Sequence, residues 1–202
     1  MLNLRKVAVT GGLSCGKSSV CRSFEKLGAY VVNADDIVHV LLTPETNLGQ
    51  NVIRLIGKDI IVNNQIDRSK ISQKVFNQPS LLNSLEHILH PAVQEEIKKQ
   101  YEIANQQKKG TLFVAEIPLL YEAGMEDFYD AVITVTADPQ LTLSRFQEFT
   151  GKGKEEYTKR MQRQLPLDDK VKRADYVIYN NGTLKDLENE TKKLMNILTH
   201  KI

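Results

Sequence analysis

Five short apolar runs divide the chain and predict buried β-strands. Their apolar residues are continuous rather than alternating, which is typical of strands that are covered on both faces of a sheet. Stretches with helical patterns separate the runs, so the pattern predicts an α/β fold with a doubly wound, parallel, five-stranded sheet. The runs lie at residues 6–10, 29–32, 111–115, 131–135 and 176–179.

Capping residues mark several helices between and after these strands. Asp138 followed by Pro139 is typical of an N-cap and a first helical residue, and Thr183 with Asp186 has the pattern of a capping box. A stripe of leucines then predicts the face with which the last helix packs on the sheet. The stripe consists of Leu184, Leu187, Leu194 and Leu198.

The segment directly after the first strand fits the P-loop pattern G-x-x-x-x-G-K-[ST]. Glycines let the backbone curve so that successive N–H groups point at phosphate oxygens, and the following helix adds its positive end. We expect Lys17 to reach the β- and γ-phosphates of a nucleotide, and the Ser18 hydroxyl to bind Mg²⁺. A glycine-rich turn without a ligand is the alternative. The expected nucleotide contacts are Gly11, Gly12, Leu13, Ser14, Cys15, Gly16, Lys17, Ser18 and Ser19.

Polar residues follow the other predicted strands. The carboxyl ends of parallel strands meet at one edge of a sheet, where ligands collect, so Thr10, Asn33, Asp35 and Glu116 are expected near the phosphate site. Asp35 is the candidate base that accepts the proton of an attacking hydroxyl, with capping of the next helix as its alternative. Glu116 either orients Mg²⁺ through water or caps a turn before Pro118.

Two longer segments interrupt the strand–helix alternation. Residues 36–110 are mostly helical by pattern, with Pro79 at a helix start and Pro91 at a kink or break, and they are too long for an ordinary crossover. They are either scaffold or, as we favour, an acceptor-binding subdomain that excludes water. Residues 146–173 are rich in lysine and arginine, which is typical of a solvated helix face but also of a mobile lid.

Composition narrows the setting. The chain has 202 residues, of which 41% are hydrophobic and 26% charged, as in an ordinary globular protein. A net charge of +2 is too small to indicate nucleic-acid binding. The first residues lack the apolar stretch of a signal peptide, and no apolar run approaches the length of a membrane span, so a cytoplasmic protein is expected.

Cys15 and Cys21 make neither a disulfide framework nor a metal-binding spacing. Cys15 lies near a predicted helix start, where the thiol pKa could be lowered enough for oxidation to block nucleotide binding. The alternative is that the thiol is simply a small side chain that fills the loop.

A series of short motifs, in this order along almost the whole chain, resembles the dephospho-CoA kinase family. Each motif is weak alone, but their joint order is specific. The motifs are Thr10-Gly11-Gly12 with the P-loop, Ala34-Asp35, Ile66-Asp67-Arg68 with Val75-Phe76, Leu89-His90-Pro91, Ile117-Pro118-Leu119-Leu120-Tyr121-Glu122, and Ala174-Asp175-Tyr176-Val177-Ile178 with Asn180 and Gly182.

The resemblance implies ATP- and Mg²⁺-dependent phosphorylation of the ribose 3′-hydroxyl of dephospho-CoA, the last step of coenzyme A synthesis. It implies a P-loop kinase core (1–35, 111–137 and 174–202), a helical acceptor-binding insertion (36–110) and a helical lid (138–173). Asp35, Lys17 and Arg145 would be catalytic, and Asn180 and Gly182 would lie beside the adenine. The lid pattern matches again at Arg160 and Gln164. Implied acceptor contacts are Thr10, Asp35, Arg68, His90, Pro118, Leu119, Glu122 and Arg160.

Some residues depart from the family pattern or keep two interpretations. Asn33 stands where the family often has aspartate, Ser14 where it usually has glycine or alanine, and Phe149 where a second lid arginine is common. Lys152, Lys154 or Arg163 would then have to substitute for that arginine, or turnover is reduced. His90 is either a core histidine beside a helix break or an acceptor contact.

Other functions remain as alternatives at this point. A nucleoside or nucleoside monophosphate kinase would differ in its acceptor, and a nucleotide-dependent switch would hydrolyse its nucleotide slowly and bind a partner protein. RNA binding is disfavoured because aromatic residues are not interleaved with the basic segment. We expect a small-molecule substrate, neither nucleic acid nor a membrane as partner, and a monomer.

Overall fold

The chain divides into two compact units in the computed structural model, which describes residues 3–76 and 78–200. The first unit is Met1–Asn33 with Tyr101–Ile202, and the second is Ala34–Gln100. Within the described residues, none of the helices combines the length and the apolar character needed to cross a membrane.

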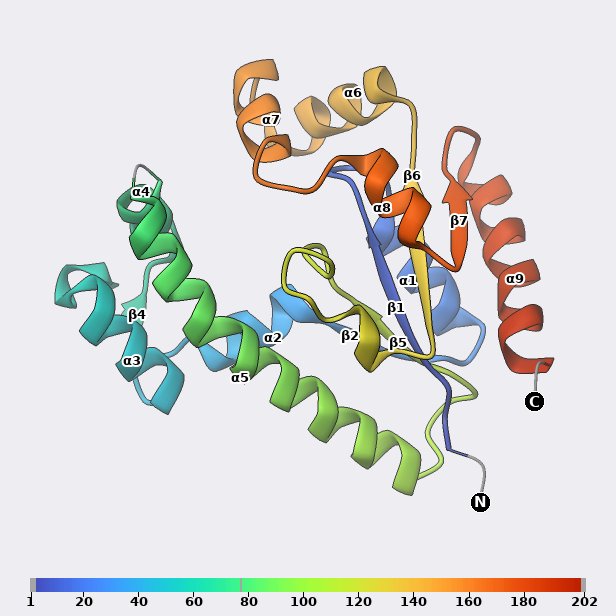
Figure 1. The fold of residues 1–202 in the computed structure, drawn as a ribbon, viewed down its shortest axis with the longest axis horizontal. Helices are drawn as coiled ribbons and strands as arrows, with labels where there is room; N and C mark the ends of the chain where they lie inside the picture. Colours follow the sequence, from blue (N-terminus) through green and yellow to red (C-terminus); the bar gives the residue numbers. More distant parts are fainter. Residues whose placement is uncertain (1–2, 77, 201–202) are drawn as a thin grey trace. The chain divides into compact units, whose positions relative to one another are not determined.

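The first unit is built on the predicted five-stranded sheet. All its strand pairs are parallel, and the strand order is β2-β5-β1-β6-β7, so the P-loop strand β1 is central (Figure 1). The α/β prediction is confirmed, and each strand lies within two residues of its predicted start. The strands are β1 Lys6–Gly11, β2 Tyr30–Asn33, β5 Phe113–Glu116, β6 Ala131–Thr136 and β7 Tyr176–Tyr179.

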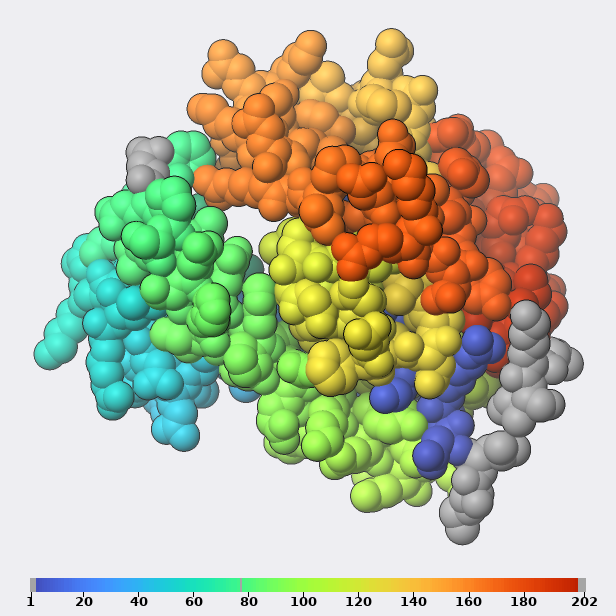
Figure 2. Space-filling view, in the orientation of Figure 1, coloured from blue at the N-terminus to red at the C-terminus, as the bar shows by residue number. Residues whose placement is uncertain are grey.

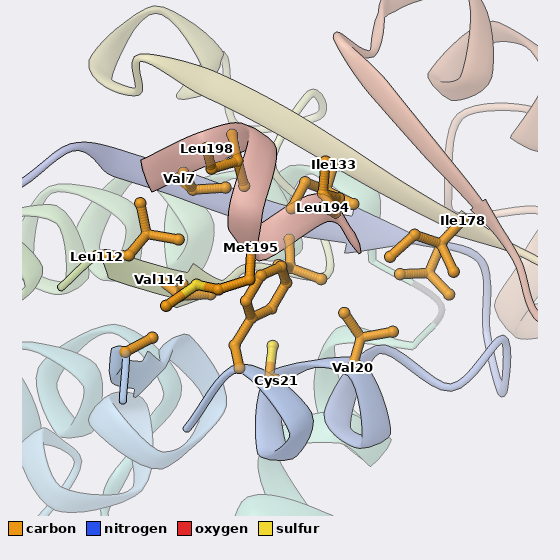
Figure 3. Close-up of a cluster of buried hydrophobic side chains, with 14 of the residues drawn as sticks. Val7, Val20, Cys21, Leu112, Val114, Ile133, Ile178, Leu194, Met195 and Leu198 are labelled. Carbon is orange, nitrogen blue, oxygen red and sulfur yellow. The ribbon is translucent and has the colours of Figure 1, made fainter. Parts of the chain in front are cut away.

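Helices α1 (Lys17–Lys26) and α9 (Leu184–His200) pack together beside the sheet and cover one of its faces. Side chains that alternate along the strands meet these helices in one apolar cluster, shown in Figure 3. Each fully buried aliphatic or aromatic side chain there stabilises the fold by about 1.5–3 kcal/mol. The cluster includes Val7, Val20, Cys21, Phe24, Leu112, Val114, Ile133, Leu194 and Leu198.

The opposite face of the sheet carries α8 (Leu167–Arg173), which packs against β6 and β1. Because side chains alternate across a strand, Ala8 and Thr10 point to this face while Val7 and Val9 point into the cluster of Figure 3. Helices α6 (Pro139–Thr150) and α7 (Lys154–Met161) lie beyond the carboxyl ends of β1 and β6 in Figure 1.

The helix ends follow the capping signals. Asp138 accepts a hydrogen bond from Gln140 N (2.8 Å), and Thr183 and Asp186 exchange the two bonds of a capping box (2.9 and 3.2 Å). The leucine stripe of α9 is buried except at Leu184, which is 62% exposed because it lies in the first turn of the helix, before the packed part begins.

The second unit consists mainly of helices, as its sequence pattern predicts. Its elements are α2 Ala34–Leu41, α3 Asn47–Ile56, η1 Lys58–Ile60, β3 Ile61–Val62, β4 Gln65–Ile66, α4 Arg68–Val75 and most of α5 Pro79–Gln106. Helix α5 begins at the predicted Pro79 and continues through Pro91, so of the predicted kink or break at Pro91 the break does not occur. The unit has a core of its own, formed by Val52, Ile53, Ile60, Ile71, Val75 and Leu85 among others.

The short hairpin of β3 and β4 is absent from the sequence prediction. Its turn residues Asn63 and Asn64 both have positive φ (50° and 59°), the conformation of a type I′ turn. Asparagine tolerates this region better than most residues, so the Asn63-Asn64 pair is the sequence signal that could have revealed the hairpin.

Candidate active site

The phosphate loop joins β1 to α1 and depends on glycine at its bends. Gly11 and Gly16 have φ of 142° and 97°, and a Cβ would collide with the Val135 carbonyl at Gly11 and with the Asn180 amide at Gly16. Gly16 is also the N-cap of α1. Because glycine has no side chain to accept from the first turn, the N–H groups there remain for an anion.

Lys17 is the first residue of α1 and folds back over this loop. Its Nζ donates to the carbonyl oxygens of Gly12 (2.7 Å) and Gly11 (3.3 Å). The loop therefore gathers a mobile ammonium group and the start of a helix at one place. This combination suits the terminal phosphates of a nucleotide.

Ser14 and Cys15 give the centre of the loop its unusual features. Ser14 adopts φ of 57°, a left-handed conformation that costs a residue with a Cβ about 1–2 kcal/mol. Cys15 is 1% exposed, and burial raises the pKa of its thiol more than the Lys17 charge lowers it. The predicted lowering of this pKa is therefore wrong, and Cys15 fills space within the loop, which was the alternative interpretation.

Glu116, at the carboxyl end of β5, connects the first turn of α1 to the end of β2. Its Oε1 accepts from Ser18 Oγ (2.8 Å) and its Oε2 accepts from Asn33 Nδ2 (3.0 Å), although the side chain is 5% exposed. Burial, followed by the nearby Glu116 carboxylate, raises the pKa of the Cys21 thiol well above its usual value. A buried carboxylate beside a serine hydroxyl provides oxygen ligands of the kind that Mg²⁺ prefers, so these residues fit the ion.

The structure joins Ser18 to Glu116, the two residues for which a Mg²⁺ role is predicted, by a hydrogen bond. Among residues 3–76 and 78–200, no three histidine, cysteine, aspartate or glutamate side chains gather as a metal-binding group. Mg²⁺ is commonly held by one or two protein oxygens together with substrate phosphates and waters. A site formed by Ser18 and Glu116 alone fits that usual number of protein ligands.

Asn180 follows β7 and ties three segments together. Its side-chain Nδ2 donates to the Cys15 carbonyl in the phosphate loop (2.9 Å), its N donates to Thr136 O (2.8 Å), and its carbonyl accepts from Arg145 Nη1 (3.1 Å). The family resemblance implies that Asn180 and Gly182 lie beside the adenine of ATP. The structure shows that this buried side chain supports the phosphate loop, while Gly182 lies two residues further along, packed against the α9 capping residue Asp186.

Thr10 and the segment after β5 form a neighbouring group. Thr10 is fully buried and its Oγ1 donates to the Pro118 carbonyl (3.3 Å). Leu119 is half-buried. Glu122 forms an ion pair with Lys170 (2.8 Å) and accepts from Leu165 N (2.8 Å). The structure thus joins three of the implied acceptor contacts, Thr10, Pro118 and Glu122, through bonds that include the Lys170 ammonium, and Leu119 is the chain neighbour of Pro118.

The basic segment folds as two helices followed by α8. Arg145 lies on α6, and Arg160 on α7 pairs with Glu156 one turn earlier (2.9 Å) and lies over the Phe146 ring. Phe149 is 81% exposed at the end of α6. Lys152 is within 3.9 Å of Glu156.

The remaining predicted site residues belong to the second unit. Asp35 is exposed and lies within the first turn of α2, one residue after its start, so it is not the N-cap of that helix. Arg68 is the exposed first residue of α4, directly after the capping Asp67, and His90 is half-buried in α5.

Sequence reasoning missed the connections among these residues. Asn33 was expected at the same edge of the sheet as Glu116 and otherwise appeared as a departure from the family pattern, but its hydrogen bond to Glu116 was not foreseen. Lys170 appeared only as one charge in a basic segment, yet it is fully buried. Neither has a local sequence signal, because their partners are 83 and 48 residues away along the chain.

Comparison with known proteins agrees with this arrangement. A family model described as dephospho-CoA kinase matches residues 5–186. The chain belongs to the dephospho-CoA kinase family. A dephospho-CoA kinase from Protochlamydia amoebophila is 51% identical over 195 residues, which cover 96% of each chain.

Solved structures extend the dephospho-CoA kinase likeness to the fold. A protein from Thermus thermophilus superposes with a TM-score of 0.83 at 29% identity, covering 98% of this chain and 100% of that one. The dephospho-CoA kinase from Campylobacter jejuni gives a TM-score of 0.72 at 26% identity, covering 98% of both chains. The likeness therefore includes both units and the phosphate loop.

Proposed function

We propose that the protein transfers the γ-phosphoryl group of ATP to the ribose 3′-hydroxyl of dephospho-CoA, giving coenzyme A and ADP. One observation carries the proposal. In a member of the dephospho-CoA kinase family, the phosphate loop is intact and connected through Ser18 to the buried carboxylate of Glu116. A cytoplasmic location and a monomeric state remain predictions from the sequence.

Phosphoryl transfer needs little covalent chemistry from the protein, so alignment and charge supply most of the acceleration. In the proposed complex the loop N–H groups and Lys17 hold the β- and γ-phosphates. Ser18 and Glu116 would hold Mg²⁺, which neutralises phosphate charge when bound. Lys17 would exchange its bonds to the Gly11 and Gly12 carbonyls for bonds to phosphate oxygens.

Asp35 is the proposed base for the acceptor hydroxyl. It is an exposed carboxylate two residues after Asn33, whose side chain donates to Glu116. Asparagine at position 33 cannot take up a proton, so one carboxylate rather than two acts on the acceptor. We further propose that residues 36–110, with Arg68 and His90, bind the acceptor.

The helices after β6 are the proposed lid, residues 138–173. Arg145 would stabilise the charge of the transferred group, and its contact with the Asn180 carbonyl keeps it close to the segment that supports the phosphate loop. Phe149 supplies no charge, so Lys152, Lys154 or Arg163 of the same segment would have to provide a second one. Arg160 is the proposed lid contact with the acceptor.

Two substitutions test these roles. Lys17→Ala should lower kcat/KM by about 10²- to 10³-fold, as expected when a charge that stabilises the transition state is removed. Asp35→Asn should lower kcat while leaving KM for ATP unchanged. Lys26→Ala, at the exposed end of α1, is the control. Undiminished transfer by Lys17→Ala, or a change in ATP binding alone for Asp35→Asn, would contradict the assignments.

A further inference from the structure

Lys170 is a lysine with no exposed side-chain surface. It lies on α8 and its Nζ contacts Glu122 Oε1 (2.8 Å) and the Pro118 carbonyl oxygen (3.2 Å). Lysine is almost never fully buried unless it is paired, because removing an ammonium group from water is costly. Lys172 on the same helix is exposed and can contribute to solubility. The buried Lys170 cannot, so it needs a specific partner.

The partners of Lys170 belong to the segment that follows β5. Glu122 Oε1 also accepts from Leu165 N (2.8 Å), at the start of the turn that leads into α8. The Pro118 carbonyl that accepts from Lys170 also accepts from Thr10 Oγ1 (3.3 Å). A continuous hydrogen-bonded chain thus connects the carboxyl end of β1, the segment after β5 and the end of the basic segment.

A second contact one turn later strengthens this connection. The Arg173 guanidinium lies 4.4 Å from the centre of the Tyr121 ring and forms an ion pair with Glu126. Figure 2 shows α8 lying directly against the segment after β5 on this face. We call Lys170, Arg173, Glu122 and Glu126 the α8 clamp. The clamp holds one end of the basic segment to the core, while α6 and α7 precede it.

We propose that Lys170 is a positioning residue for acceptor binding. It fixes Pro118 and Glu122 and, through the shared Pro118 carbonyl, the hydroxyl of Thr10. This inference rests on the proposed function, in which these residues contact dephospho-CoA. The bonds that shape the phosphate loop, Ser18 to Glu116 and Asn180 to Cys15, do not involve Lys170. Leu167 at the start of α8 lies next to Gly12 of that loop, so loss of Lys170 should weaken acceptor binding strongly and ATP binding only slightly.

A double-mutant cycle separates positioning from stability. Lys170→Met alone leaves the Glu122 carboxylate without its lysine partner and should lower Tm strongly. Lys170→Met with Glu122→Leu replaces both charges by apolar groups, so its Tm should return most of the way to that of the parent. The variants are compared, at a temperature where circular dichroism shows each to be folded, by KM for dephospho-CoA, KM for ATP, kcat and calorimetric affinity for dephospho-CoA.

The expected result is an acceptor KM raised about tenfold or more in both the single and the double variant, with KM for ATP changed less than about twofold. Comparison of the double variant with Glu122→Leu alone measures how much of the positioning Lys170 exerts through Pro118 and Thr10. The exposed pair of the same helix, Lys172 and Asp169 (3.4 Å), supplies the matched control, Lys172→Met with Asp169→Leu, which should leave all these values unchanged.

Three outcomes would overturn the inference. If the folded double variant binds the acceptor as the parent does, Lys170 is structural only. If Lys170→Met raises KM for ATP as much as KM for dephospho-CoA, its effect is general and is not a positioning of the acceptor. If the parent itself neither binds nor phosphorylates dephospho-CoA, the proposed function fails and the inference fails with it. If the parent phosphorylates dephospho-CoA and the variants do so equally well, the inference about Lys170 fails and the proposed function stands.

Discussion

At the scale of single residues, the phosphate loop depends on positions where a methyl group cannot fit. Gly16 and Gly28 have nearly the same backbone conformation (φ 97° and 92°), but a Cβ would collide with the Asn180 amide at Gly16 and would meet nothing within 4 Å at Gly28. Alanine at Gly28 would add backbone strain alone, whereas alanine at Gly16 would add the same strain and also displace the Asn180 amide.

Both alanine variants should lose stability, and only one should lose nucleotide binding. Gly28→Ala should lower the free energy of unfolding by about 1–2 kcal/mol with ATP affinity unchanged, because its cost is conformational. Gly16→Ala should lower it further and weaken ATP binding, because the Asn180–Cys15 bond is displaced. Denaturant unfolding and ATP titration measure the two effects. Equal ATP affinities for the two variants would show that the Asn180 contact does not shape the loop.

The two thiols give a prediction about pH and reactivity. Cys15 and Cys21 are 1% and 3% exposed, and burial raises the pKa of both. A raised pKa leaves less thiolate at pH 8, so iodoacetamide should modify the native chain on the order of 100-fold more slowly than the unfolded chain. Both thiols stay protonated to a higher pH in the folded chain than in the unfolded chain. The free energy of unfolding should therefore fall as pH rises above about 8.5, where the thiols of the unfolded chain lose their protons. Modification of native Cys15 at the unfolded rate would restore the redox interpretation.

Residue identities in the loop were predictable because the motif is local, whereas their partners were not. The sequence placed Lys17 and Ser18 from spacing alone, but it could not show that Asn33 and Ser18 both donate to Glu116. It also misjudged the Cys15 pKa, since it considered the nearby helix end and not the burial, which dominates.

At the scale of elements, the sheet was predictable because its strands are covered on both faces. Continuous apolar runs mark such strands, and all five were located from them. The β3–β4 hairpin was missed because each strand has only two residues, too few for a period to show. Helix α5 continues through Pro91, where a kink or a break was expected, and local propensity could not exclude the break because packing overrides propensity.

Helix α6 offers a test of an element that carries a proposed catalytic residue. Asp138 caps it through Gln140 N, and Arg145 lies two turns later. Asp138→Ala should lower the free energy of unfolding by about 1 kcal/mol, and Asp138→Asn, which can still accept this bond, should lower it by a smaller amount. Chemical denaturation of the three proteins checks the order. Equal losses for alanine and asparagine would mean that the cap contributes nothing specific.

At the scale of the whole molecule, the order of the segments along the chain was easier to predict than the contacts that join them. The P-loop, the long helical segment and the basic segment were each visible as composition and pattern. What joins the segments of the first unit is a set of buried polar contacts, among them Glu116 with Ser18 and Lys170 with Glu122, each between residues far apart in sequence. Such contacts follow from the fold, so they became visible only with it.

The central claim is that the first unit binds ATP through its phosphate loop and delivers the γ-phosphoryl group to dephospho-CoA. The most direct measurement incubates the purified chain with Mg²⁺, ATP and dephospho-CoA and identifies the products by mass spectrometry and phosphorus NMR. We expect coenzyme A with a new phosphate on the ribose 3′ oxygen and an equal amount of ADP, and formation of both slowed by about 10²- to 10³-fold with Lys17→Ala. Binding of ATP with no transfer to dephospho-CoA, or transfer to another hydroxyl, would contradict it.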